Sequence, residues 1–240
     1  MKTFFTLLVS LLFTAFTALN ATNYTNNGSK VNYSLVNKDT LRITGGIFKG
    51  KIQTFVNGAV IIVSANAVFD PESIATPAGK IINYGTCTFT TLGTYSGFDF
   101  DNYNLLKITG SLSLYDGYTQ FWTNYVGGTI NISGSFSMNN AEFSNNAKVF
   151  VGGDFAMYIS TSLVENTGSI IIAGNLNMSN GVLNNMNKIS MDNLNTWGGV
   201  VKNEGELAPD GNMVFGNGSS YINKCLLVSE KGFTNYGDFT

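Results

Sequence analysis

The chain has 240 residues, enough for one large domain with a continuous core. It is 44% hydrophobic and only 12% charged, with a formal net charge of −2, so charge offers no basis for binding nucleic acid or an anionic membrane. Histidine is absent, and the 31 Asn and 27 Gly residues predict many tight turns.

Residues 1–21 read as a secretory signal peptide. Lys2 supplies the positive start, an apolar run from Thr3 to Ala18 follows, and small residues predict cleavage near Ala21. A membrane anchor is the alternative, but the run is short for a spanning helix. No later segment is apolar enough to cross a bilayer, so we expect a secreted protein without membrane insertion after cleavage.

Asparagine marks a repeat along the chain. In most units, an asparagine that we call the anchor is followed by an apolar residue four positions later. Seven steps from Asn83 to Asn223 cover 140 residues, a mean of 20 residues per step. The anchors are Asn37, Asn57, Asn83, Asn102, Asn124, Asn145, Asn166, Asn185, Asn203, Asn223 and Asn235.

Apolar columns recur after the anchors. An alternating pair is followed by a glycine, a second pair and a short apolar patch. The first pairs are Leu41/Ile43, Ile61/Val63, Cys87/Phe89, Leu106/Ile108, Ile130/Ile132, Val149/Val151, Ile170/Ile172 and Ile189/Met191. The glycines are Gly45, Gly110, Gly134, Gly153, Gly174 and Gly211. The final patches include Phe121, Phe143, Leu163, Leu183 and Tyr221.

These columns predict an all-β fold. Alternation with a period of two is typical of strands with one buried face, and the glycine indicates a bend between two strands. A unit of about 20 residues cannot bury its apolar face alone, whereas stacked units can. We therefore predict a parallel β-helix, or solenoid, of about ten coils with three short strands per coil. A left-handed hexapeptide helix and an antiparallel sandwich are the structural alternatives.

One unit carries a resemblance to a known group. The pattern N-x-G-x-I-x-I-x-G-x-L-x-M, from Asn166 to Met178, resembles the irregular repeats of right-handed parallel β-helices. That group includes pectate-lyase-like enzymes and bacterial surface adhesins. The resemblance covers residues 37–240 and implies an architecture rather than one activity, because solenoids host unrelated functions.

The remaining segments are interpreted around this repeat. Residues 22–36 are expected to form an N-terminal cap, since an uncapped sheet edge invites aggregation. The segment "FDPESIATPAGK" is expected to leave the coil as a loop, because Pro71 and Pro77 cannot serve in a central strand. The last residues, "NYGDFT", open another coil, so we expect the helix of residues 37–240 to continue beyond Thr240.

Chemistry-bearing residues are few. Cys87 and Cys225 lie too many coils apart for a disulfide, so we expect two free thiols, with Cys87 in the core. Asp99 and Asp101 share a strand face and are weak candidates for a calcium site or an acid–base pair, the alternative being a solvated loop. No cofactor and no catalytic set is predicted.

The outward positions suggest a surface that binds a ligand. Small polar residues flank the second strands, and the expected ligand face consists of Ser111, Ser113, Ser135, Ser137, Asn175 and Asn177. An outward hydroxyl column is expected at Thr44, Ser64, Thr90, Thr109 and Ser133. Candidate sugar-stacking residues are Tyr115, Tyr118, Trp122 and Tyr125, although Phe121 and Trp122 cannot both point outward.

The sequence thus favours a secreted or bacterial cell-surface solenoid with a structural or adhesive role and no catalysis. Its expected partner is an extracellular polysaccharide or a host or neighbouring cell surface. A polysaccharide-binding or polysaccharide-degrading β-helix is the first alternative, and an ice-binding solenoid is the second.

Overall fold

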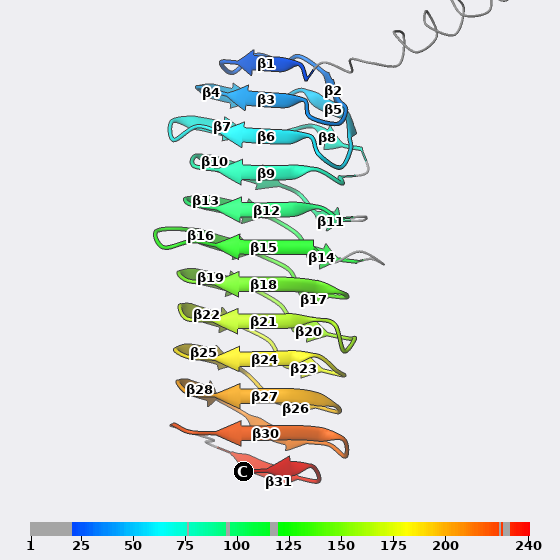
Figure 1. Cartoon of the computed structure of the whole chain (residues 1–240). Helices are drawn as coiled ribbons and strands as arrows, with labels where there is room; N and C mark the ends of the chain where they lie inside the picture. Colours follow the sequence, from blue (N-terminus) through cyan, green and yellow to red (C-terminus); the bar gives the residue numbers. More distant parts are fainter. Residues whose placement is uncertain (1–20, 76, 95–96, 116–119, 226, 228–230) are drawn as a thin grey trace, which may run out of the picture.

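The computed structural model describes residues 21–75, 77–94, 97–115, 120–225, 227 and 231–240. Residues 1–20 of the predicted signal peptide lie outside this part. The described residues form a parallel β-solenoid of about ten turns, with three strands per turn and turns roughly 20 residues apart (Figure 1). The predicted fold class is therefore confirmed.

Within each sheet, neighbouring strands between β2 and β30 lie three apart in chain order, so successive coils stack strand on strand. The 12-stranded sheet consists of β1 (Asn23–Asn26), β3 (Thr40–Ile43), β6 (Val60–Val63), β9 (Lys80–Asn83), β12 (Asp99–Asn102), β15 (Gln120–Asn124), β18 (Ala141–Asn145), β21 (Leu163–Asn166), β24 (Val182–Asn185), β27 (Gly199–Asn203), β30 (Ser219–Asn223) and β32 (Asp238–Phe239). The 9-stranded sheet consists of β4 (Gly46–Phe48), β7 (Ala67–Phe69), β10 (Thr86–Phe89), β13 (Leu105–Ile108), β16 (Thr129–Ile132), β19 (Lys148–Val151), β22 (Ser169–Ile172), β25 (Lys188–Met191) and β28 (Glu206–Pro209).

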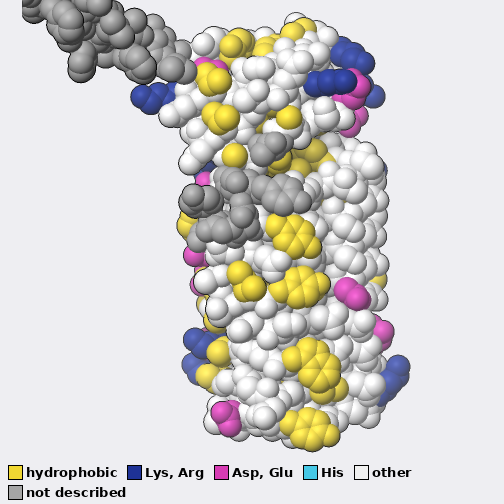
Figure 2. All heavy atoms as spheres, turned by 90° about the vertical axis from the view of Figure 1, so that its right-hand side faces the viewer, with side chains coloured by type: hydrophobic (Ala, Val, Ile, Leu, Met, Phe, Trp, Pro, Cys, Tyr) yellow, Lys and Arg dark blue, Asp and Glu magenta, His cyan; other side chains and the backbone are white. Residues whose placement is uncertain are grey.

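The third face is divided between two sheets. A 3-stranded sheet contains β2 (Tyr33–Leu35), β5 (Lys51–Phe55) and β8 (Ser73–Ile74). An 8-stranded sheet contains β11 (Leu92–Thr94), β14 (Leu112–Leu114), β17 (Phe136–Met138), β20 (Phe155–Met157), β23 (Leu176–Met178), β26 (Leu194–Thr196), β29 (Asn212–Phe215) and β31 (Gly232–Asn235). Figure 2 views the side where turns connect this third face to the 12-stranded sheet.

The inward side chains of all three faces form one continuous apolar core. Cys87 belongs to it, is fully buried, and lies in register between Phe69 and Leu106 of the adjacent strands. Both cysteines are free thiols, and Cys225 is exposed. The thiol state and the core position of Cys87 are therefore confirmed.

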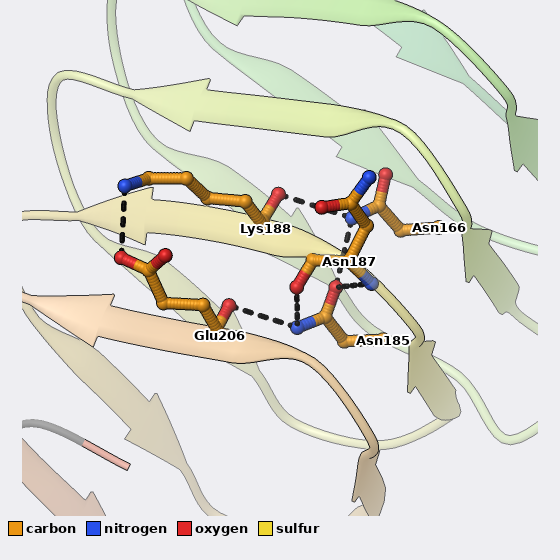
Figure 3. A network of polar contacts seen from close by, with 5 residues as sticks. All are labelled: Asn166, Asn185, Asn187, Lys188 and Glu206. Atoms are coloured by element: carbon orange, nitrogen blue, oxygen red, sulfur yellow. Dashed lines mark hydrogen bonds and ion pairs between the residues drawn. The ribbon is translucent and has the colours of Figure 1, made fainter. Parts of the chain in front are cut away.

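A buried asparagine ladder lies where the 12-stranded sheet turns into the 9-stranded sheet. The Nδ2 group of each member donates to Oδ1 of the next at 2.7–2.8 Å. In addition, Asn185 Nδ2 donates to the backbone oxygens of Asn187 and Glu206, at 3.1 and 2.9 Å (Figure 3). The members are Asn83, Asn102, Asn124, Asn145, Asn166, Asn185, Asn203 and Asn223, and the first seven are fully buried. The repeated anchors thus satisfy buried polar groups from coil to coil.

Five of the six predicted glycine bends lie between the 9-stranded and 8-stranded sheets, whereas Gly45 lies between β3 and β4, where the 12-stranded sheet turns into the 9-stranded sheet. Backbone hydrogen bonds join Gly110, Gly134, Gly153 and Gly174 of consecutive coils at 2.8–3.1 Å. A Cβ atom on Gly174 would lie 2.9 Å from the Gly153 backbone, which real Cβ contacts essentially never show. The bend therefore requires glycine for steric reasons.

The predicted alignment of the first two repeats is wrong. Val63 pairs with Asn83, and Ile43 pairs with Val63, so these residues lie in the column of the asparagine ladder rather than beside Cys87. Asn37 and Asn57 occupy exposed turns. An alternating apolar pair looks the same on any face of a solenoid, and for this reason the sequence could not assign these two pairs to a sheet.

Two further expectations change. Phe121 and Leu163 point outward, because the core column runs one residue later, through Trp122 and Val164. The proline segment does not leave the coil: it contains β8, which pairs with β5. The residues expected to form a cap contribute β1 and β2, which pair with β3 and β5.

Candidate ligand-binding surfaces

Asp99 and Asp101 lie on the outward face of β12, but protein groups already engage both carboxylates. Asp101 forms a 2.6 Å ion pair with Lys80, and Asp99 Oδ1 accepts a 3.0 Å hydrogen bond from the Phe121 backbone. Within the described residues, no group of three or more His, Cys, Asp or Glu side chains has a metal-binding arrangement. The nearby base is Lys80 of the preceding coil.

Burial and the Lys80–Asp101 ion pair together shift the pKa values of Asp99 and Lys80. Burial raises the pKa of Asp99, and the hydrogen bond from Phe121 only partly offsets this effect. Burial also acts to lower the pKa of Lys80, but the hydrogen bond and charge of Asp101 outweigh it, so that pKa is raised. The result is a charged Lys80–Asp101 pair beside a carboxyl group that is easier to protonate than usual.

The residues predicted to form a ligand face align in two columns along the 8-stranded sheet. Its groups bind one another: Ser137 Oγ donates to Ser113 Oγ at 3.0 Å, and Ser111 Oγ accepts from the Ser135 backbone at 3.2 Å. Further along, Asn175 Oδ1 accepts from Asn193 at 2.7 Å. Asn177 Oδ1 likewise accepts a 3.0 Å bond from Asn195. Much of the hydrogen-bonding capacity of this face is therefore used within the protein.

Trp122 is not a sugar-stacking residue. It is 1% exposed, its Nε1 donates to the Phe98 backbone oxygen at 3.2 Å, and its ring stacks on Phe100 with centroids 4.9 Å apart. Phe121 takes the outward position instead and is 51% exposed. Adjacent strand residues point to opposite faces, and the larger, hydrogen-bonded indole fills the core.

Tyr125 belongs to a stack of three tyrosines on neighbouring coils. Its ring centroid lies 4.2 Å from that of Tyr103, which lies 4.7 Å from that of Tyr84. Burial raises the pKa of Tyr103 to about 12, and hydrogen bonding with Tyr125 adds to this shift. Because the rings cover one another, the stack offers mainly edges and hydroxyl groups to a ligand.

Tyr115 lies in a second column of exposed aromatics, at the turn that follows the 8-stranded sheet. Figure 2 shows hydrophobic side chains gathered in a line along this side of the solenoid. The column consists of Tyr115, Tyr158, Trp197 and Tyr236, which are 36%, 47%, 61% and 72% exposed. Tyr118 lies outside the described residues.

Sequence reasoning missed Tyr158, Trp197 and Tyr236. Each follows directly after a third-face strand, as Tyr115 follows β14. The detectable signal was an aromatic residue one position after the second apolar pair in every other repeat. It was overlooked because the intervening repeats carry Asn139, Ser179 and Gly216 at that position.

The predicted hydroxyl column does not exist as one face. Thr44 and Ser64 follow strands of the 12-stranded sheet, whereas Thr90, Thr109 and Ser133 follow strands of the 9-stranded sheet. The error repeats the misalignment of the first two repeats, so the ordered hydroxyl array expected for an ice-binding face is not formed by these residues.

A cavity of about 300 Å³ lies at the break between the 3-stranded and 8-stranded sheets, lined by residues 71–74, 77 and 89–93. Its acidic residue, Glu72, forms ion pairs with Lys30 and Lys51 at 3.3 and 3.4 Å, and these partners lower its pKa. The lining residues therefore provide no free acid–base pair.

Comparison with known proteins found no matching protein family, no similar curated protein and no similar solved structure. Among the described residues, no helix has the length and apolar character needed to cross a membrane.

Proposed function

We propose that this chain is a non-catalytic β-solenoid of the adhesin type, exported to the bacterial cell surface, where it serves as a structural and adhesive element. The observation that carries the proposal is the continuity of the stack. Seven consecutive asparagine–asparagine hydrogen bonds and a continuous core join the coils into one unit. Such a rod suits a stalk or a binding surface.

The side-chain chemistry supports the same role. The Asp99 and Asp101 carboxylates and the two polar columns of the 8-stranded sheet form hydrogen bonds or ion pairs within the protein. The surface therefore offers side chains for contact with a partner rather than for catalysis, including the exposed aromatic column. An extracellular polysaccharide is the partner that this surface suits best, since tyrosine and tryptophan supply large, rigid contact area at low entropy cost.

A polysaccharide-degrading enzyme is the second candidate, based on the outward carboxylates of Asp99 and Asp101 beside Lys80. One experiment separates the two. The purified protein is incubated with a panel of neutral and uronic-acid polysaccharides, with binding and the release of cleaved products both measured.

The expected result is binding without cleavage, unchanged in the Asp99→Ala/Asp101→Ala double variant. Cleavage that is lost in the double variant would overturn the proposal. Cleavage that is retained in it would also do so and would place the catalytic residues elsewhere.

A further inference from the structure

The exposed aromatic column has a regular period of two coils. Tyr158, Trp197 and Tyr236 each donate their backbone N–H to the preceding coil, from Tyr158 to Met138, from Trp197 to Met178 and from Tyr236 to Phe215. Because adjacent coils lie about 4.8 Å apart, successive rings are spaced about 10 Å apart along the axis. We call Tyr115, Tyr158, Trp197 and Tyr236 the aromatic track.

The coils between the rings carry small or short polar residues at the same position. Asn139, Ser179 and Gly216 occupy it, and their backbone N–H groups make the equivalent bonds to the preceding coil. A Cβ atom on Gly216 would lie 3.1 Å from Trp197 Cε3, so the indole lies against the glycine of the next coil. The Trp197 side chain nevertheless remains 61% exposed.

The described turns around the track are uncharged. From Asn139 onward they contain only Asn, Ser, Thr, Ile and Gly besides the aromatic residues. These turn residues are Asn139, Asn140, Tyr158, Ile159, Ser160, Thr161, Ser162, Ser179, Asn180, Gly181, Trp197, Gly198, Gly216, Asn217, Gly218, Tyr236 and Gly237. These uncharged turns favour a ligand that offers apolar ring faces and hydroxyl groups.

We propose that the aromatic track binds a neutral, extended β-1,4-linked polysaccharide whose chain lies parallel to the solenoid axis. In such chains each sugar is turned over relative to the last, so the same ring face recurs at every second sugar, close to the two-coil spacing of the track. The apolar C–H face of a pyranose ring fits the negative face of an aromatic ring. This assignment rests on the proposed adhesive role and specifies its ligand.

The spacing of the rings along the aromatic track distinguishes β-1,4-linked from α-1,4-linked sugar chains. An α-1,4-linked chain winds into a helix and cannot keep one sugar face in line with rings about 10 Å apart. A ligand that contacts two rings must span three sugars or more, so affinity should rise steeply between a disaccharide and a hexasaccharide. With no charge in the described part of the track, binding should change little with ionic strength.

The test uses the purified protein and measures its affinity for cellohexaose, chitohexaose, maltohexaose and cellobiose by calorimetry. We expect cellohexaose or chitohexaose to bind, with little binding of maltohexaose or cellobiose. Trp197→Ala should weaken hexasaccharide binding by about tenfold or more, as is typical of an aromatic anchor. Tyr158→Ala should have a smaller effect in the same direction.

The matched control is Tyr84→Ala, because Tyr84 is 44% exposed but belongs to the separate tyrosine stack. Its effect on affinity should stay within about twofold, which is near the limit of a meaningful difference. Ser179→Tyr fills the gap between Tyr158 and Trp197 and should weaken binding by disturbing the two-coil register. Thermal melting of each variant checks that the fold is retained.

Absence of binding to both β-1,4-linked hexasaccharides overturns the proposal, as does equal affinity for maltohexaose, equal losses in Trp197→Ala and Tyr84→Ala, or tighter binding by Ser179→Tyr. If a different glycan or a cell surface binds with no dependence on Trp197, the proposed ligand of the aromatic track is wrong and the proposed adhesive role is retained. If the protein instead cleaves its ligand, the proposed non-catalytic function fails.

Discussion

The asparagine ladder is open to a direct test through Asn145→Ala. Asn145 takes part in five side-chain hydrogen bonds, three through Nδ2 and two through Oδ1. Its Nδ2 donates to Asn166 Oδ1 at 2.8 Å and to Ser169 O at 3.2 Å, while its Oδ1 accepts from Asn124 Nδ2 at 2.8 Å. Alanine removes all five bonds at a fully buried position.

The cost follows from the groups that lose a partner. Asn124 Nδ2 keeps its 3.1 Å bond to Lys148 O, so it remains satisfied. Asn166 Oδ1 and the Ala147 N–H lose the partner that Asn145 provided. A buried polar group left unsatisfied costs about 1–3 kcal/mol, so the expected loss in the free energy of unfolding is about 3 kcal/mol.

Urea unfolding followed by circular dichroism measures this loss. The matched control is Asn146→Ala, which removes a single exposed hydrogen bond, the 2.8 Å bond from Thr167 Oγ1 to Asn146 Oδ1. The control should cost about 0.5–1 kcal/mol. Equal losses in the two variants would refute the argument that the ladder stabilises the stack.

Three other predictions concern the bend, the core thiol and the outward carboxyl. Gly153→Ala should lower the free energy of unfolding by about 1–3 kcal/mol, because the new Cβ would lie 2.6 Å from Ser135 Oγ. Gly45→Ala should change it by less than about 0.5 kcal/mol, because nothing lies within 4 Å, and similar urea midpoints for the two variants would contradict the bend argument. Burial raises the pKa of Cys87, so its stabilising contribution is complete below the pKa of the unfolded thiol and is lost as pH rises above it. The stability difference between the wild type and Cys87→Ala should therefore shrink above about pH 8.5, and a constant difference across alkaline pH would oppose this. Burial also raises the pKa of Asp99, so its contribution is present below the ordinary carboxyl pKa and lost as pH rises through the raised value. Asp99→Asn should therefore melt at a higher temperature than the wild type near neutral pH, with the gain vanishing below about pH 4, and a gain that persists in acid would exclude ionisation as its cause.

Some features of the candidate site could be predicted from the repeat pattern, and others could not. The pairing of Ser113 with Ser137 followed from repeat spacing alone, because equivalent positions of consecutive coils lie side by side. The burial of Trp122 did not follow, since it depends on which of two adjacent aromatic residues faces the core. The aromatic track was visible only once the turns had been aligned by their hydrogen bonds to the preceding coil.

The sequence by itself determined the architecture. The repeat contains three local signals: period-two apolar pairs, a recurring glycine and an asparagine about every 20 residues. Each signal predicts which residues of one coil are buried or where the chain bends. Only the tertiary structure decided which sheet receives Leu41 and Ile43, that the asparagines form one hydrogen-bonded ladder, and that aromatic rings recur at every second coil. The physical reason is that these features depend on the register between coils. Register is set by packing and hydrogen bonding between residues about 20 positions apart, and no pattern within one repeat specifies it.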